Sequence, residues 1–286
     1  MSRKYFAFGS LLAEYTGELS LLTGTALEKF SASPGRPDFT VELRQEALPS
    51  CGDCARIAQM PDGAVYRKNG IWHRRFVANY NGDFREYAVV EYTDRTAILT
   101  VAPDCGNVPQ CVESCTAFEH LALSADALPL HASHIQIGGR AILFTAPSGT
   151  GKSTQAALWQ EHRGAEIING DKALLLCGAR PIFASGLPYS GTSGICRNAA
   201  AELQAIVVLQ QGKKNVLTRL SGGRAVIRLM TGVICQNWHE NDAEKALSLA
   251  IRTVETVPIY SLSCLPDESA VACLETALQE LSKEEK

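Results

Sequence analysis

The chain has 286 residues, of which 46% are hydrophobic, so it can bury a sizeable core without disulfide or metal staples. Its 27 Lys and Arg residues and 30 Asp and Glu residues give a formal net charge of −3. That balance excludes a strongly basic protein that binds nucleic acid or an anionic membrane surface as its main role.

The N-terminal sequence MSRKYFAFGSLLAEYTG places basic residues before an apolar run, as a secretory leader does. Glu14 interrupts this run and no small-residue cleavage site follows it, so we expect a buried first strand instead. No other segment approaches the ~20 continuous apolar residues of a spanning helix. We therefore predict a soluble cytoplasmic protein with no membrane partner.

Residues 1–125 are predicted to form a β-rich domain. Polar and apolar side chains alternate in residues 38–44, and two further strands are expected around a charged turn in residues 85–101. Asn69 and Gly70 separate two more such runs, and this dipeptide favours a tight hairpin because both residues tolerate a positive φ. Residues 111–130 are rich in Ala and Leu and are predicted to be helical up to Pro129.

The chain has 10 cysteines, and half of them lie in two groups in the first 115 residues. Cys51 and Cys54 form a CxxC pair, which is a common half-site for zinc or an iron–sulfur centre. Cys105, Cys111 and Cys115 have other spacings, and no histidine lies among them. Reduced thiols are the prediction for all five, with a metal centre as the open alternative.

Residues 126–286 are predicted to form an α/β domain. Two short strands joined by Gly138 and Gly139 are expected in residues 134–146, followed by a helix that Gly164 caps. Further strands are expected at 165–170 and 205–210. The C-terminal part is predicted to be helix, strand and helix, with Asn241 and Asp267 as N-terminal caps.

A phosphate-loop pattern lies between the second of these strands and the helix. The segment APSGTGKS, residues 146–153, fits the pattern except that Ala146 replaces the first glycine. Glycines let successive backbone N–H groups point at phosphate oxygens, and the helix directs its positive end at the same place. Lys152 is expected to reach the β- and γ-phosphates and Ser153 to ligate Mg²⁺. The expected nucleotide contacts are Ser148, Gly149, Thr150, Gly151, Lys152, Ser153 and Thr154.

Asp171 is the candidate second ligand for the metal ion. It follows the strand expected at 165–170 and stands nineteen residues after Lys152, so one helix and one strand return the chain to the loop. An aspartate at the end of such a strand suits the metal ligand of a nucleotide site. The sequence NGD is also ordinary turn chemistry, so a purely structural role is the alternative.

The sequences SGTGKST and INGDK resemble the nucleotide-binding core of HPr kinase/phosphorylase and ATP-dependent phosphoenolpyruvate carboxykinase. HPr kinases carry a histidine fifteen residues before the loop, and His131 stands fifteen residues before Ala146. Residues 257–278 also look like the closing strand and helix of small kinases related to HPr kinase. The resemblance covers residues 130–278 and implies a P-loop core with a mixed sheet, ATP and Mg²⁺ as cofactors, and a kinase activity. The phosphoryl acceptor would be a hydroxyl group of a peptide, a protein or a small molecule.

The chain departs from this family at one informative position. Gly170 stands where the family has the first of two adjacent aspartates, so with Asp171 committed to Mg²⁺ the resemblance leaves His131 as the leading general base. Arg197 is expected to contact the transferring phosphoryl group or an anionic acceptor. A surface role for Arg197 is the alternative. Ser190, Gly191 and Ser193 are expected to shape the acceptor pocket, and His134 is expected to be structural.

Two other functions remain open at the level of the sequence. One is a small-molecule kinase of the shikimate or nucleotide kinase kind, which would have a five-stranded parallel sheet and a lid drawn from residues 209–229. The other is a non-catalytic, ATP-gated protein for peptide binding or maturation, which the missing aspartate at position 170 favours. Neither the acceptor nor the oligomeric state follows from the sequence.

Overall fold

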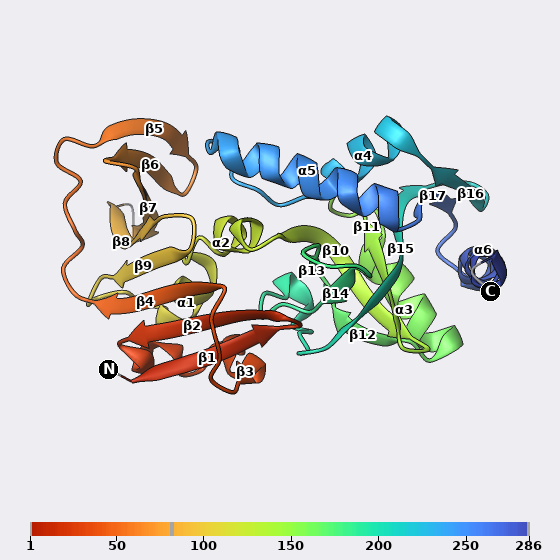
Figure 1. The fold of residues 1–286 in the computed structure, drawn as a ribbon, viewed down its shortest axis with the longest axis horizontal. Coiled ribbons are helices and arrows are strands. Elements are labelled where there is room, and N and C mark those ends of the chain that lie inside the picture. The colour runs from red at the N-terminus through yellow and green to blue at the C-terminus, as the bar shows by residue number, and fades with distance from the viewer. Residues whose placement is uncertain (1, 81–82, 285–286) are drawn as a thin grey trace. The chain divides into compact units, whose positions relative to one another are not determined.

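The computed structural model describes residues 2–80 and 83–284, and these form two compact units (Figure 1). Unit 1 comprises Met1–Ala125 and Gln236–Asp242, and unit 2 comprises Asp126–Cys235 and Ala243–Lys286. Each unit contains a mixed β-sheet and helices, so the predicted α/β class is confirmed. The assignment of 1–125 and 126–286 as domains stays a prediction, and the return of residues 236–242 to unit 1 was not expected.

The sheet of unit 1 has nine strands in the described residues, in the order β3-β1-β2-β4-β9-β8-β7-β6-β5. Strand β4 runs parallel to β2 and β9, whereas the other pairs are antiparallel. The strands are β1 (Arg3–Phe8), β2 (Leu11–Gly17), β3 (Ser31–Ala32), β4 (Phe39–Gln45), β5 (Ala55–Met60), β6 (Gly63–Lys68), β7 (Ile71–Tyr80), β8 (Asp83–Tyr92) and β9 (Thr96–Val101). The helices of the unit are α1 (Val108–Ser114), α2 (Phe118–Ser124) and two 3-10 turns, Leu19–Leu22 and Ala26–Phe30.

Two hairpins in unit 1 show how local turn residues set the strand pairing. Asn69 and Gly70 have φ values of 50° and 81°, so the predicted tight turn between β6 and β7 is confirmed. The buried first strand predicted at the N-terminus is confirmed as β1, and the chain then turns at Gly9, where φ is 62°, and pairs β1 with β2. The alternating pattern of these strands buries Phe6, Phe8 and Tyr15 in the core.

The helix predicted for residues 111–130 is confirmed in part, because α1 and α2 cover much of this segment, but its continuation to Pro129 is wrong. Ala117 has a φ of 54°, which ends the first helical stretch and separates α1 from α2. Helix α2 ends at Ser124, and the following residues join strand β10 (Ala127–Ile137) by pairing with strand β13 (Lys172–Leu176). Pro129 therefore lies inside a strand, opposite Leu174, because long-range pairing overrides the helical composition.

The sheet of unit 2 has eight strands in the described residues, and five of them close into a ring. The ring order is β11-β10-β13-β14-β15, and β11 also pairs with β15. Strand β15 runs parallel to β11 and β17, whereas the other pairs are antiparallel. The further elements are β11 (Arg140–Thr145), α3 (Lys152–Arg163), β12 (Glu166–Asn169), β14 (Phe183–Ser185), a 3-10 turn (Gly191–Ser193), β15 (Ala200–Gln211), β16 (Val216–Leu220), α4 (Gly222–Met230), α5 (Glu240–Thr256), β17 (Ile259–Cys264) and α6 (Glu268–Glu284).

Helix α3 is fixed at its C-terminal end and along one face. Gly164 at its C-terminus has a φ of 68°, which confirms the predicted cap. Trp159 is 2% exposed and belongs to a core cluster that includes Phe144 of β11 and Leu274 of α6. Packing against the sheet and α6 therefore holds the N-terminal end of α3 in place behind the loop that follows β11.

The predicted caps of the last two helices have different outcomes. The Asp267 carboxylate accepts a hydrogen bond at 2.9 Å from the Ser269 N–H, so Asp267 caps α6 as predicted. Asn241 is wrong as a cap, because α5 already begins at Glu240 and places Asn241 inside its first turn. Of the helices that the structure describes, none combines the length and apolar character needed to cross a bilayer.

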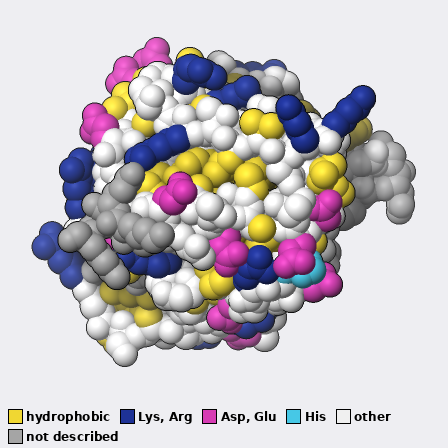
Figure 2. Space-filling model, turned by 90° about the vertical axis from the view of Figure 1, so that its right-hand side faces the viewer, with side chains coloured by type: hydrophobic (Ala, Val, Ile, Leu, Met, Phe, Trp, Pro, Cys, Tyr) yellow, Lys and Arg dark blue, Asp and Glu magenta, His cyan; other side chains and the backbone are white. Residues whose placement is uncertain are grey.

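Charged side chains of both signs mix on the face drawn in Figure 2, around a band of hydrophobic side chains. The small net charge of −3 agrees with such mixing.

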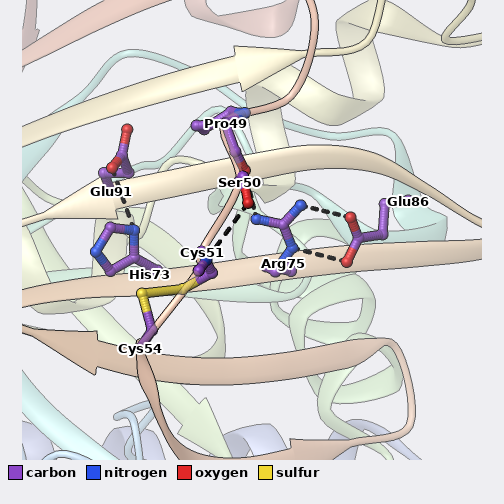
Figure 3. The surroundings of a disulfide bond; sticks show 9 residues. Pro49, Ser50, Cys51, Cys54, His73, Arg75, Glu86 and Glu91 are labelled. Atoms are coloured by element: carbon purple, nitrogen blue, oxygen red, sulfur yellow. Dashed lines mark hydrogen bonds and ion pairs between the residues drawn. A yellow bond between two sulfur atoms is a disulfide. The ribbon is translucent and has the colours of Figure 1, made fainter.

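The prediction of reduced thiols is wrong for Cys51 and Cys54, which form a disulfide (Figure 3). The turn between them brings their Cα atoms to 5.4 Å, which is within the span of a disulfide. His73 lies near this pair and its Nδ1 is 3.2 Å from Glu91. Cys105, Cys111 and Cys115 are free, and the sulfurs of Cys105 and Cys111 are 3.0 Å apart.

Candidate functional site

A glycine-rich loop joins β11 to α3 at residues 146–151 of unit 2. Gly149 and Gly151 have φ values of 76° and 115°, which are conformations that only glycine adopts without strain. Gly151 stands immediately before the first residue of α3. The loop therefore combines the permissive backbone and the helix N-terminus of an anion-binding turn.

Lys152 is buried beneath this loop, with 7% of its surface exposed. Its ammonium group donates a hydrogen bond at 3.0 Å to the carbonyl oxygen of Ala146. Burial lowers the pKa of Lys152, and the nearby Asp171 carboxylate partly opposes that shift. A cation that has lost much of its water and is bound to a neutral carbonyl gains most from an anionic partner.

His131 and Asp171 form a pair across the same region. His131 lies on β10, Asp171 lies in the turn between β12 and β13, and the His131 Nε2 is 3.1 Å from the Asp171 Oδ1. An ionised carboxylate only accepts hydrogen bonds, so Nε2 carries a proton and the neutral ring has its free lone pair on Nδ1. About a third of each side chain is exposed, so both can reach a ligand.

Asn169 fixes the turn that presents Asp171. Its side-chain oxygen accepts hydrogen bonds at 2.9 Å from the N–H groups of Asp171 and Lys172. Its amide donates at 2.9 Å to the carbonyl oxygens of Leu187 and Tyr189. Asn169 is fully buried, and its four bonds tie two segments together at the site.

Strand β10 contributes further hydrogen bonds that hold His131 and Asp171 in register. The Thr145 hydroxyl donates at 2.9 Å to the His131 carbonyl oxygen, and the Ser133 hydroxyl donates at 2.9 Å to the Gly170 carbonyl oxygen. The Ala132 N–H donates at 2.9 Å to the Asp171 carbonyl oxygen. The pair therefore sits on a rigid sheet rather than on a free loop.

The segment Gly191–Ser193 packs directly onto the turn. A Cβ atom on Gly170 would lie 2.6 Å from the Cβ of Ser193, so Ser193 fills the volume that a side chain at position 170 needs. A Cβ on Gly191, where φ is 54°, would lie 2.7 Å from the Cγ of Asp171. Both glycines are required by close approach, and a side chain at position 170 would need Ser193 to move.

The glycine-rich loop, Lys152 and the pair of His131 and Asp171 line one cavity of about 300 Å³. A second cavity, of about 340 Å³, shares Gly149, Gly151 and Thr154 with the first. The first is lined by His131, Ser148, Gly149, Gly151, Lys152, Ser153, Thr154, Gly170, Asp171 and Ser193. The other residues that line the second cavity are Thr150, Gln155, Gln211, Gly212, Cys264, Leu265 and Pro266.

The structure thus brings together most of the residues singled out in the sequence. Thr150 lines the second cavity rather than the first, and Ser193 lines the first. Arg197 is not among the described residues that line either cavity, and its guanidinium pairs with Glu166 instead. The roles assigned to all these residues stay predictions.

Sequence reasoning missed Asn169 as a site residue. The signal was present in the sequence NGD, since an asparagine before such a turn bonds to backbone N–H groups two and three residues on. The bonds of Asn169 to residues 187 and 189 had no local signal, because those residues are distant in sequence.

Comparison with known proteins gives a matching family and distant structural similarity to solved structures. A family model described as "SynChlorMet cassette protein ScmC" matches residues 107–266. A search of curated proteins gave no match. Among solved structures, the Hpr(Ser) kinase/phosphatase from Coxiella burnetii is similar with a TM-score of 0.33 and 10% identity, over 55% of this chain and 99% of that chain.

Proposed function

The chain belongs to the SynChlorMet cassette protein ScmC family, and we propose that it is a kinase that uses ATP and Mg²⁺ to phosphorylate a hydroxyl group. The observation that carries the proposal is one cavity that contains the glycine-rich loop, Lys152, Ser153 and the pair of His131 and Asp171. Phosphoryl transfer needs a phosphate cradle, a cation, metal ligands and a group that handles the acceptor proton. The described residues of this cavity offer each of them.

The phosphate chain is expected to lie against the loop. Gly149 and Gly151 supply the permissive backbone, and α3 supplies its positive N-terminal end. Lys152 would exchange its bond to the Ala146 carbonyl for a phosphate oxygen, which suits a partly desolvated ammonium group. The nucleoside fits the second cavity, which borders the same glycines and Thr154.

The residues of the cavity fit Mg²⁺ as well. The Ser153 hydroxyl and the Asp171 carboxylate line it, and both offer the oxygen ligands that this hard cation prefers. When bound, the ion would neutralise charge on the phosphate oxygens. Among the residues that the structure describes, these two are the ones that we expect to hold it.

His131 is the proposed general base. With its Nε2 proton donated to Asp171, the ring keeps the Nδ1 lone pair for the proton of the acceptor hydroxyl. The Asp171 carboxylate stabilises the imidazolium that then forms and fixes the tautomer of the ring. The pair thereby replaces the second acid that Gly170 cannot supply.

The mixed sheet favours this kinase over a small-molecule kinase of the shikimate kind. Strands β10, β13 and β14 of the ring are antiparallel to their neighbours, whereas the rival predicts five parallel strands. Acceptors with a hydroxyl on a peptide, a protein or a small molecule all remain consistent with the cavity. The Ser193 segment borders it and is expected to contact the acceptor.

One observation favours a non-catalytic, ATP-gated protein as the second candidate. Ser193 fills the space beside Gly170, so no acid can replace that glycine without moving the segment Gly191–Ser193. A site in which Asp171 both holds the metal ion and supports His131 would then bind ATP without transferring phosphate. The two functions differ in whether a phosphoryl group leaves the nucleotide.

The test uses the purified full chain with Mg²⁺ and ATP labelled in its γ-phosphate. It measures nucleotide affinity, ATP hydrolysis and transfer of label to two libraries, one of peptides that contain Ser, Thr or Tyr and one of small-molecule alcohols. The variants are Lys152→Ala and Asp171→Asn, and Lys214→Ala on the exposed β15–β16 connection is the matched control. We expect transfer by the wild type and the control, and a loss of about 100-fold or more in the two site variants.

Binding of ATP with no hydrolysis and no transfer in any variant would instead establish the ATP-gated function. Equal transfer by the wild type and Lys152→Ala would place the chemistry outside this cavity and overturn the proposal. Transfer confined to small-molecule hydroxyls would support the proposed site and restrict its acceptors to small molecules.

A further inference from the structure

Unit 1 buries two histidines and one aspartate together, away from the site just described. His120 lies on α2, and His239 and Asp242 come from the segment 236–242 that returns to this unit. Their exposed fractions are 1%, 4% and 2%. One ligand atom from each lies within 4.8 Å of the others, so the three could reach a single ion.

Hydrogen bonding fixes which nitrogen of His120 carries a proton. Its Nε2 lies 3.2 Å from the backbone carbonyl oxygen of Thr93, and a carbonyl oxygen only accepts, so Nε2 is protonated. Its Nδ1 lies 2.7 Å from the Oδ1 of Asp242. Nδ1 therefore either carries a second proton or has a free lone pair. In the second case, a cation could bind both this lone pair and the Asp242 carboxylate.

Two more polar atoms at this place have no hydrogen-bond partner among the described residues. They are the Nδ1 of His239 and the Oδ2 of Asp242, and both are buried. The His239 Nδ1 is 3.4 Å from the same Oδ1 that faces His120. A doubly protonated His120 would satisfy one oxygen of Asp242 and leave both of these atoms unpaired, which is unfavourable in a protein interior.

We propose that unit 1 binds one divalent transition-metal ion of the zinc class through His120, His239 and Asp242. The ligands are the Nδ1 atoms of the two histidines and the carboxylate of Asp242. Imidazole and carboxylate together suit Zn²⁺, and a carbonyl that accepts the other N–H of a ligating histidine is a common outer partner. The Thr93 carbonyl supplies that partner, and the ion would pair both the His239 Nδ1 and the Asp242 carboxylate.

Three protein ligands leave a fourth position for water or a small ligand, which is the arrangement of reactive zinc sites. A cavity of about 700 Å³ in unit 1 includes His239 and Trp72 in its lining. The rings of these two residues pack against each other with centroids 4.5 Å apart. Of the three proposed ligands, His239 is the one that borders this cavity.

The other cluster of this kind in the described residues does not fit a metal ion. Cys51 and Cys54 are bonded to each other, and His73 beside them faces Glu91 (Figure 3). Disulfide sulfurs offer no thiolate, so this group lacks the charge that zinc sites use. It supplies a control residue, because His73 is in the same unit and outside the proposed site.

The test measures metal in the purified full chain after dialysis against Zn²⁺, and separately against Co²⁺. The variants are Asp242→Asn and His239→Gln, each close in shape to the residue it replaces, with His73→Gln as the matched control. Circular dichroism checks that each variant is folded. We expect one Zn²⁺ per chain in the wild type and the control, and a loss of affinity of about 100-fold or more in the two site variants.

Two further readouts separate this site from thiol ligands and from a plain ion pair. The Co²⁺ form should show visible d–d absorption without the charge-transfer band of cysteine ligands. Nitrogen NMR should show that the Nδ1 of His120 is unprotonated once Zn²⁺ is bound, with release of protons on binding if the apo ring is charged.

Three results would overturn the proposal. They are the absence of stoichiometric Zn²⁺ in the wild type, affinity unchanged in both site variants, and a His120 ring that stays doubly protonated in excess Zn²⁺. A variant that fails to fold decides nothing by itself, and the Co²⁺ spectrum and the NMR measurement on the wild type then carry the test.

Discussion

The side-chain oxygen of Asn169 accepts a hydrogen bond from the backbone N–H of Asp171 at 2.9 Å, and this bond sets the turn of the proposed site. Asn169→Ala removes that bond and three others, so it should lower the free energy of unfolding by about 2–4 kcal/mol. Urea unfolding measures the change. Asn198→Ala, at an exposed position nearby, should change the stability by less than about 0.5 kcal/mol. Equal effects of the two substitutions would show that the bonds of Asn169 contribute no special stability.

His131 is expected to act in the chemical step rather than in nucleotide binding. His131→Ala should lower the turnover of phosphoryl transfer by about 100-fold or more, because a positioned general base contributes on this order. The affinity for ATP, measured by calorimetry, should stay within a few-fold. His162→Ala on α3 provides a histidine control outside the cavity. An unimpaired rate in His131→Ala would assign this histidine a structural role.

His134 makes unit 2 sensitive to acid. Its ring is fully buried with no hydrogen-bond partner among the described residues, and burial lowers its pKa to about 3. The unfolded chain, in which this pKa is about 6.5, binds one more proton between the two values, so stability decreases as the pH falls below about 6.5. The decrease approaches about 1.4 kcal/mol per pH unit.

A His134→Leu variant should lack this component. Between pH 7 and pH 5, its free energy of unfolding should fall by about 2 kcal/mol less than that of the wild type. Urea unfolding at the two pH values measures the difference, whatever the absolute stability of the variant. Parallel pH curves for the two proteins would contradict the prediction.

Gly170 and Ser193 should be energetically coupled. Gly170→Ala puts a Cβ atom into the space that Ser193 occupies, and such overpacking costs about 1–3 kcal/mol. Ser193→Gly in the same chain should recover most of that loss, which a double-mutant cycle measures. Gly178→Ala is the control, because its new Cβ would meet only an ordinary contact at 3.6 Å from Asp126. Additive effects of the two changes would rule out the coupling.

The elements that the sequence predicted well are those with a local physical cause. Asn69 and Gly70 form their hairpin, and Gly164 ends its helix, because a positive φ at these positions decides the local geometry. Residues 111–130 show the limit of this reasoning. Their composition favours a helix, but the pairing of β10 with β13, which lies more than 40 residues away, makes part of them a strand.

The residues that we expect to contact phosphate could be selected from the sequence because they lie in one short motif, residues 146–153. Arg197 shows the limit of this reasoning. Its ion pair with Glu166 joins two segments that are separated in sequence, and no local pattern predicts that they meet. The cluster in unit 1 was not predictable at all. His120 and His239 are far apart in sequence, and only the return of residues 236–242 to this unit brings them together.

The packing of Ser193 against Gly170 also constrains the order in which this site could change. An aspartate introduced at position 170 by itself would meet the Ser193 side chain and destabilise the turn before it could contribute any chemistry. A smaller residue at position 193 would have to come first, to open the volume. A pair of adjacent acids at positions 170 and 171 therefore requires two substitutions, and the steric contact with Ser193 decides their order.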